Sequence, residues 1–306
     1  MTFELLREGR VWLEYSSTFY LLHTMRDVTF SQTFAQEGVA KRTLHAPNNL
    51  FEGSLIQKAN PADFSFTLYM LDEASVHQHL PLDLLIDYSG NTLKQFNLYF
   101  VYENNSTPVY YKIENAVFTG GTFNIPRAGI MTVALNGQGT KLTRTEASWS
   151  NSDGSYDSTP SFAVSKEFIV SVAGSNLDNI QGASLELLNN IDWTKNETVH
   201  STKSVTNASN TIFPSNFTLQ SRTLGGSISQ YIDSTNAQSV NNLLTWQENT
   251  SVRIRAGLSA SNLQLDVEMN NACSFTNRAT FGDIFSQNYD FRLMTNPTDL
   301  NTYFTY

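Results

Sequence analysis

The chain has 306 residues, of which 40% are hydrophobic, including 20 Phe and 13 Tyr. This is enough apolar material for two domain cores, and it excludes a disordered protein. Charged residues make up only 15% of the chain, the net charge is −9, and neither half has a basic cluster, which disfavours tight nucleic-acid binding through phosphate neutralisation. The single cysteine, Cys273, cannot form an intrachain disulfide, and residues 1–8 lack the apolar core of a signal peptide. Both features fit assembly in a reducing cytoplasm.

Alternation of apolar and polar residues predicts most elements of the first half. The clearest strand covers residues 64–70, where four apolar residues alternate with Ser65, Thr67 and Tyr69 after an Asn-Pro entry at 60–61. Other strands are predicted at residues 10–15, 19–22, 28–34, 96–102, 109–117 and 130–135. Residues 72–88 predict one helix that Pro81 interrupts. The glycines at 120–121 and 137–139 are interpreted as turns.

Residues 35–53 show no sustained period and contain two glycines and Pro47, which predicts a long loop or an extended hairpin arm. Aligning Leu22 with Leu185, and Phe66 with Phe217, gives two different shifts, which places extra residues of the first half in this arm. Long connections of this kind are usually functional. The alternative is a packed surface loop.

Residues 146–165 are rich in Ser, Asn, Asp and Gly, which predicts a linker between domains at 1–145 and 166–306. Beyond it the order of elements recurs, with strands at 168–172, 185–193, 217–219, 252–256 and 263–270 and a helix near 239–244. The sequence Asn271-Ala272 also repeats Asn115-Ala116. We therefore predict a mainly β fold with two copies of one domain, each with one flanking helix. The alternative is two unrelated β domains.

The search for enzymatic chemistry finds no convincing site. His77 and His79 lie two residues apart in the predicted helix and so on different faces, which indicates solvated polar residues and not metal ligands. Cys273 has no histidine close in sequence and is interpreted as a small buried residue. The sequence contains no serine elbow, phosphate-binding loop or paired carboxylates. The expectation is therefore a protein that is not an enzyme, without catalytic residues, metal or cofactor.

The predicted sheets have one apolar face and one face of Ser, Thr, Asn and Gln. Because each phosphate neutralised by Lys or Arg adds affinity, an uncharged or acidic face would let a polyanion pass without adhering. Exposed sheet edges pair with neighbours, and a head-to-tail contact whose rotation closes gives a ring.

The order of elements resembles the tail tube proteins of tailed bacteriophages, a family similar in fold to the inner tube protein of type VI secretion and to tube domains of baseplate hubs. The resemblance covers essentially the whole chain, as two tandem tail-tube-type β-sandwich or barrel domains. The resemblance is carried by the arm at 35–53, the strand at 64–70, the helix around 80–88 and the closing strands at 110–135. It is a resemblance of pattern, because no catalytic motif defines the family.

The resemblance implies a structural virion protein whose rings, trimeric with pseudo-sixfold symmetry or hexameric, stack into the tail tube and conduct DNA during ejection. The implied partners are other copies of the chain, baseplate and tail terminator proteins, and sheath or tape measure proteins, while DNA passes without specific binding. The implied location is the virion tail, after assembly in the cytoplasm of a bacterial host. The arm would reach the adjacent ring through Leu44, Leu50 and Phe51, and the candidates for facing the lumen are Ser65, Thr67, Gln264, Asp266 and Glu268.

Two alternative functions remain open at this point. Paired tube domains also suit a baseplate hub or a tube-end adaptor. The other alternative is a two-domain module that binds a glycan or a receptor. In such a module an exposed tryptophan would stack on a sugar, and the candidates are Trp12, Trp149, Trp193 and Trp246. Tryptophans are, however, usually buried in the core.

Overall fold

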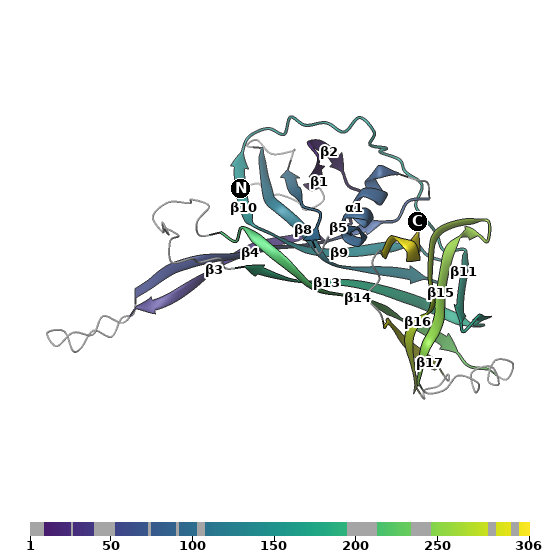
Figure 1. The fold of residues 1–306 in the computed structure, drawn as a ribbon. Helices are drawn as coiled ribbons and strands as arrows, with labels where there is room; N and C mark the ends of the chain where they lie inside the picture. The colour runs from purple at the N-terminus through teal and green to yellow at the C-terminus, as the bar shows by residue number, and fades with distance from the viewer. Residues whose placement is uncertain are drawn as a thin grey trace, which may run out of the picture.

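The computed structural model describes residues 9–25, 27–39, 53–72, 75–89, 92–102, 108–194, 213–233, 246–280, 286–294 and 300–306. Within these ranges the fold is mainly β, as predicted. Figure 1 shows long antiparallel strands that extend at one end into a projecting hairpin, with a helix packed above the sheet. No helix in the described ranges is long and apolar enough to cross a membrane.

The first half has ten described strands, which include the seven that the sequence predicts, two of them much longer than predicted, and three further strands at Tyr88–Ser89, Thr92–Leu93 and Lys141–Glu146. They are β1 (Gly9–Tyr15), β2 (Thr18–Leu21), β3 (Thr29–Val39), β4 (Gly53–Tyr69), β5 (Tyr88–Ser89), β6 (Thr92–Leu93), β7 (Phe96–Tyr102), β8 (Val109–Pro126), β9 (Thr132–Gly139) and β10 (Lys141–Glu146). The predicted helix is α1 (Val76–Ile86), and Pro81 lies inside it without ending it. Ser75 caps its N-terminus by accepting a hydrogen bond from the His77 N–H.

The glycines at 120–121 and 137–139 do not form turns, so that prediction is wrong. They lie inside β8 and β9. A Cβ atom on Gly121 would lie 2.4 Å from Leu85 Cδ2 of α1, and one on Gly137 would lie 2.3 Å from Phe64 Cζ and 2.4 Å from the Val117 carbonyl oxygen. These positions need glycine because neighbouring elements approach the strand closely.

The described residues of the second half form strands and one short C-terminal helix. They are β11 (Glu167–Val172), β12 (Ser175–Asn176), β13 (Ile180–Thr194), β14 (Asn216–Tyr231), β15 (Trp246–Ser259), β16 (Asn262–Thr280), β17 (Ser286–Leu293), the 3₁₀ helix η3 (Leu300–Tyr303) and β18 (Phe304–Thr305). The single strand β13 replaces the two strands expected around 185–193. The helix predicted near 239–244 lies outside the described residues.

The two halves pair their strands in the same order. The order is β2-β1-β7-β8-β9-β4-β3 in the first half and β12-β11-β15-β16-β17-β14-β13 in the second. Asn115 and Asn271 have left-handed φ angles of 48° in matching strands, β8 and β16, at a register shift against β7 and β15 respectively. The halves are joined into one sheet because β13 pairs antiparallel with β8, from Gly182 opposite Pro126 to Leu188 opposite Gly120.

This strand order corrects the alignment made from the sequence. Leu22 follows β2, whereas Leu185 lies in β13, which matches β3. Phe66 pairs with Leu135 of β9, whereas Phe217 lies beyond the part of β14 that pairs with β17. The arm therefore does not hold extra residues of the first half, since residues 40–52 connect β3 to β4 and the longer stretch 195–215 connects β13 to β14.

Residues 147–165, which we call the strap, are bound to the first half along their length. Trp149 packs against Trp12 with ring centroids 5.3 Å apart. Further on, the Asp72 N–H donates to the Ser161 carbonyl at 2.8 Å, and the Ala163 N–H donates to the Met70 carbonyl at 2.8 Å. The predicted linker is thus a packed part of the first half and not a free spacer.

Candidate assembly surfaces

One face of the sheet carries polar side chains continuously from the first half to the second. The strands involved, which we call the platform, are β3-β4-β9-β8-β13-β14-β17-β16, with the C-terminal parts of β8 and β16. Two adjacent cross-strand rows on this face read Thr132, Asn124, Ser184, Ser227, Asp290, Thr276 and Thr67, Ala134, Thr122, Glu186, Gly225, Arg292, Ser274. On the opposite face buried residues such as Phe123, Leu185 and Tyr289 form a core that spans both halves.

The candidates for facing the lumen fall into two separate groups. Ser65 and Thr67 lie on the polar face of β4, where Ser65 Oγ is 2.8 Å from Thr29 Oγ1 and Thr67 Oγ1 donates to Asp27 Oδ2 at 3.0 Å. With Thr122 and Asn136 they line a shallow depression of about 280 Å³. These two candidates belong to the platform.

The other three candidates lie in the part of β16 that pairs with β15, away from the platform rows. Arg253 donates to Asp266 at 2.9 and 2.7 Å and lies 3.2 Å from Glu268, and the hydrogen bond to Asp266 is the main cause that raises the pKa of Arg253. Gln264 is buried and donates to Asp72 Oδ1 at 2.9 Å. Gln264 therefore joins the two halves of the fold, and we do not propose it as a residue that lines the lumen.

We call the contact between β8 and β13 the internal joint. Two side chains of the second half bind the C-terminus of α1 beside this joint. Arg222 Nη2 donates to the carbonyls of Leu85 at 2.9 Å and Ile86 at 2.8 Å, and Arg222 Nε donates to Asn189 Oδ1 at 2.7 Å. Asn189 Nδ2 donates to the carbonyls of Leu85 at 3.2 Å and Phe118 at 3.0 Å. A cation at a helix C-terminus satisfies the last carbonyls and complements the helix dipole.

Aromatic and apolar side chains close the same region. Trp193 at the end of β13 is buried against Leu93 and Val117, with Phe217 packed on it, and its Nε1 donates to Gln138 Oε1 at 2.9 Å. The ladder of the internal joint is thus flanked by the capped end of α1 and by an aromatic cluster.

The four tryptophans differ in exposure. Trp12 and Trp193 are buried, and Trp149 is half-buried in the cluster with Trp12. Trp246, at the start of β15, is 65% exposed. Of the four, only Trp246 has the exposure that sugar stacking or another surface contact would need.

Ser75, His77 and Asp153 are residue types that hydrolases use in catalysis. Their contacts in this fold are structural. His77 Nε2 lies 2.6 Å from Asp153 Oδ2, and both side chains are almost fully buried. The prediction that His77 is solvated is therefore wrong, because the strap covers it. Ser75 Oγ, 3.1 Å from His77 Nδ1, already accepts the N–H of His77 as the helix cap. The group ties the strap to α1.

The strap also shifts the pKa values of two nearby groups. Burial raises the pKa of Asp153, but hydrogen bonds from the Leu21 N–H, from Ser155 and from His77 outweigh it, so the pKa lies below its ordinary value. Burial, and secondly the nearby His77, lower the pKa of His23, whose ring stacks on Tyr156 with centroids 4.6 Å apart.

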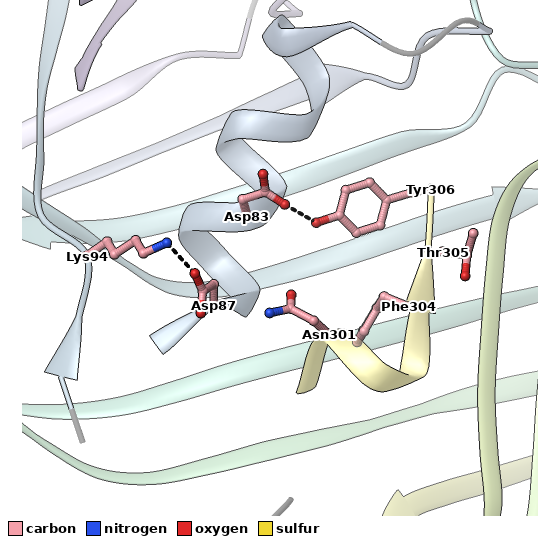
Figure 2. A pocket seen from close by; sticks show the side chains of 7 residues that line it. All are labelled: Asp83, Asp87, Lys94, Asn301, Phe304, Thr305 and Tyr306. Atoms are coloured by element: carbon pink, nitrogen blue, oxygen red, sulfur yellow. Dashed lines mark hydrogen bonds and ion pairs between the residues drawn. The ribbon is translucent and has the colours of Figure 1, made fainter. Parts of the chain in front are cut away.

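A cavity of about 480 Å³ lies where the C-terminal segment meets α1 (Figure 2). Its lining residues are Asp83, Asp87, Lys94, Asn301, Phe304, Thr305 and Tyr306. Tyr306 Oη donates to Asp83 Oδ1 at 2.5 Å, and Lys94 Nζ is paired with Asp87 Oδ2, the main cause that raises the pKa of Lys94. The contact between Tyr306 and Asp83 fastens the C-terminal segment to α1, and the contact between Lys94 and Asp87 ties the residue that follows β6 to the end of the helix.

The remaining sequence candidates have structural positions or lie outside the described residues. Cys273 is buried, as predicted, and burial raises its pKa to about 12. His79 packs edge-on against Tyr306, with ring centroids 5.4 Å apart. Among the described residues no group of three or more His, Cys, Asp or Glu could hold a metal ion. Leu44, Leu50 and Phe51 lie outside the described residues.

Comparison with known families matches nearly the whole length of this fold. A model described as "Phage tail tube protein" matches residues 16–293. The chain belongs to the phage tail tube protein family. Membership in the tail tube family gives the chain a structural role in the tail, as the resemblance implied.

Solved structures give more distant likenesses. A chain of the anti-feeding prophage (AFP) baseplate has 11% sequence identity and a TM-score of 0.36, covering 45% of this chain and 92% of that chain. A chain of the extended sheath-tube complex of an extracellular contractile injection system, PVC, has 7% identity and a TM-score of 0.36, covering 46% of this chain and 89% of that chain. No curated protein matches the chain.

Proposed function

We propose that the chain forms rings that stack into the tail tube, with the polar face of the platform lining the lumen through which DNA passes. The observation that carries this proposal is the continuity of the polar rows across the internal joint, from Thr132 of the first half to Thr276 of the second. A single surface that both halves share suits a lining, because each half contributes its strands side by side.

The chemistry of this face supports passage without adhesion. The rows contain mainly Ser, Thr and Asn, and the charged residues on this face include Asp63, Glu186, Asp290 and Arg292. Few phosphates could be neutralised on such a surface, so DNA would gain little affinity and meet little drag. The proposed role needs no catalysis.

We further propose that three chains form each ring, with six matching halves around it. The support is the repeated strand order of the two halves. On this proposal one chain corresponds to two tandem tube domains, 1–145 and 166–306. If the contact between chains repeats the contact between halves, a head-to-tail ring results. In this arrangement the implied partners are baseplate, terminator and sheath or tape measure proteins.

The hairpin of β3 and β4 is proposed to bridge rings. It projects from the body of the sheet in Figure 1, and residues 40–52, which follow β3 and precede β4 in the sequence, lie outside the described residues. Deletion of residues 40–51 is expected to leave a folded protein that forms rings but no longer stacks, because the strand pairs from Thr29–Ser65 to Ala35–Lys58 would be kept. Normal tubes from this deletion would contradict the assigned role.

Negative-stain electron microscopy of the purified protein over a concentration series tests the function itself. Stacked hollow rings are the expected result. Single rings that never stack would favour the alternative of a baseplate hub or tube-end adaptor, which the paired domains also suit. Monomers at every concentration would overturn the proposal and direct attention to Trp246 as part of a glycan or receptor site, which a glycan array would then test.

A further inference from the structure

We propose that residues 147–160 of the strap, which we call the cover, open on acidification and expose an aromatic face of the first half, and that His23 senses the pH. The cover and this face belong to one chain. The switch therefore does not depend on how copies of the chain assemble.

The aromatic face is formed by side chains of β1, β2 and β7 that form a cluster separate from the main core. Its buried residues are Trp12, Leu21, Tyr99 and Val101. Trp149 of the cover packs on them, with ring centroids 5.3 Å from Trp12 and 5.1 Å from Tyr99, and Tyr156 of the cover packs on the same cluster. Opening of the cover would bring these apolar side chains into contact with water.

The matching positions in the second half are polar. Asn115 and Asn271 set the match, because they have the same backbone conformation in matching strands. Counted from them through the strand registers, the residues that match the four buried ones are Ser171, Asn176, Arg253 and Arg255. The fold itself therefore does not require apolar residues on this face, and those of the first half serve the contact with the cover.

The cover is held by side chains, whereas the rest of the strap is held by its backbone. In the described part of the chain, the backbone hydrogen bonds from the strap to the first half begin at Ser161, whose carbonyl accepts the Asp72 N–H, and continue at Ala163. The cover is fastened by the aromatic packing of Trp149 and by the hydrogen bond from the Leu21 N–H to Asp153 at 2.8 Å. Opening the cover breaks none of the described strand ladders, so it costs less than unfolding of the whole chain.

His23 lies where protonation disturbs this fastening. Its ring stacks on Tyr156 of the cover with centroids 4.6 Å apart and lies edge-on to His77 of α1 at 5.7 Å. Its Nε2 is buried and has no hydrogen-bond partner among the described residues. Protonation would place a charged N–H there that meets neither water nor an acceptor while the cover is closed.

The charged groups around His23 come from several elements and act in opposite directions. Asp153 and Asp157 of the cover favour the protonated ring, and His77 of α1 opposes it. Burial is the largest effect and outweighs the two carboxylates, so the pKa of His23 is lowered in the closed state. Other titratable residues of the neighbouring strands, which act on Tyr156, pack on His77 or bond the His23 carbonyl, are Arg10, Tyr20 and Tyr69.

The direction of the switch follows from this pKa. Because the closed cover disfavours the protonated ring, the open form binds the proton first as the pH falls below the ordinary value of 6.5. The ratio of open to closed chain therefore rises by up to about tenfold between pH 7.5 and 5.5. Asp153 holds the Leu21 N–H until more acidic pH, since its own pKa is lowered.

Thiol labelling under the cover tests the switch. Val101→Cys places a thiol on the aromatic face, and Cys273, buried in the second half, reports unfolding of the whole chain in the same sample. Labelling with 4,4′-dithiodipyridine, at a concentration too low for assembly, is followed for the two peptides by mass spectrometry between pH 5 and 8. Each rate is divided by that of the same chain carrying His23→Phe, which removes the pH dependence of the thiol itself.

The rate ratio of the introduced thiol is expected to rise up to about tenfold between pH 7.5 and 5.5, while that of Cys273 stays constant. A ratio that does not change with pH overturns the switch. A ratio that rises in step with that of Cys273 also overturns it, because the whole chain would then be unfolding.

Trp149→Ala is the matched control for the cover. It removes the main apolar contact of the cover and leaves His23 in place, so labelling should be faster at every pH with its pH dependence kept. Unchanged labelling of this variant would show that the cover does not protect the face. If Val101→Cys does not fold, the parent chain is compared with His23→Phe by the fluorescence of the dye ANS, which binds exposed apolar surface. Greater ANS binding by the parent chain at pH 5.5 supports the switch, and equal binding overturns it.

Discussion

The internal joint and the two outer edges of the platform are parts of one sheet with very different surroundings. At the joint, β13 meets β8 over a continuous ladder, and Asn189, Arg222 and Trp193 seal the region beside it. At the outer edges, β3 and the end of β16 have strand partners on one side only among the described residues, and Phe34 and Trp246 are exposed. The difference lies in how many sides of each strand have partners among the described residues: both sides at the joint, and one side at the outer edges.

The sheet beside the joint can be broken most severely through Gly226 of β14, which lies opposite Leu185 in the β13–β14 ladder. A Cβ atom there would lie 2.1 Å from the Ser184 carbonyl oxygen and 2.7 Å from Phe291 Cζ. Because backbone cannot move aside cheaply, Gly226→Ala is expected to cost about 3 kcal/mol of unfolding free energy, measured by denaturant titration. The control is Gly154→Ala in the strap, where nothing lies within 4 Å of the added atom. Equal stability of the two variants would show that the β13–β14 ladder is loosely packed at this position.

The second largest effect on stability is expected from the hydrogen bonds of Arg222 to the C-terminus of α1. Arg222→Met would remove the hydrogen bonds to the Leu85 and Ile86 carbonyls and leave these groups without that donor. The expected loss is about 2 kcal/mol, because hydrogen bonds from charged donors to buried acceptors exceed the usual net value. Arg292→Met, on the exposed polar face of β17, is the matched control and should change stability by less than about 0.5 kcal/mol. Similar losses in both variants would remove the distinction between joint and surface.

Residues at the strap, away from the joint, give the folding stability a smaller dependence on pH. Because the pKa of His23 is lowered from its ordinary value of 6.5, the unfolded chain binds a proton before the folded one does. Stability is therefore full above about pH 6.5 and falls as the pH decreases below it. Asp153, whose pKa is also lowered, adds a further loss at more acidic pH, as the pH falls through its folded pKa.

Melting temperatures between pH 5 and 8 measure this dependence. His23→Phe should flatten the curve above pH 5, because it removes the titrating ring but keeps an aromatic side chain to stack on Tyr156. A curve as steep as that of the parent chain would show that the pH dependence does not come from His23.

The smallest effect on folding is expected at the outer edge. Trp246→Ser should change the unfolding free energy of the dissociated chain by less than about 0.5 kcal/mol, because a largely exposed side chain contributes little to the core. Denaturant titration at a concentration too low for assembly measures it. A loss above about 2 kcal/mol would mean that Trp246 belongs to the core of its own chain and not to an interface.

The alternation of side chains is sufficient to predict the longer strands of the first half other than β10, and the mainly β class. Phe64, Phe66 and Leu68 follow a period of two that only a half-buried strand explains. The repeat of Asn115-Ala116 at Asn271-Ala272 correctly marked residues in matching strands, because both asparagines occupy a left-handed position that few residues tolerate.

Other features could not be read from the sequence, because they depend on contacts between distant segments. The glycines of β8 and β9 suggest turns in the sequence, whereas Gly121 and Gly137 are needed because Leu85 and Phe64 approach the strands closely. Arg222 gave no signal beyond being a charged residue among Ser and Thr. The burial of His77 depends on the strap, which looks like a polar linker until Trp149 and Asp153 are seen in place.

The number of chains in a ring is the most direct test of the account, since the account makes the joint within a chain equivalent to the contact between chains. Native mass spectrometry of isolated rings, combined with rotational averaging of their images, measures it. Three chains per ring with six similar lobes is the predicted result. Six chains per ring, or closed dimers, would contradict the equivalence between the internal joint and the outer edges.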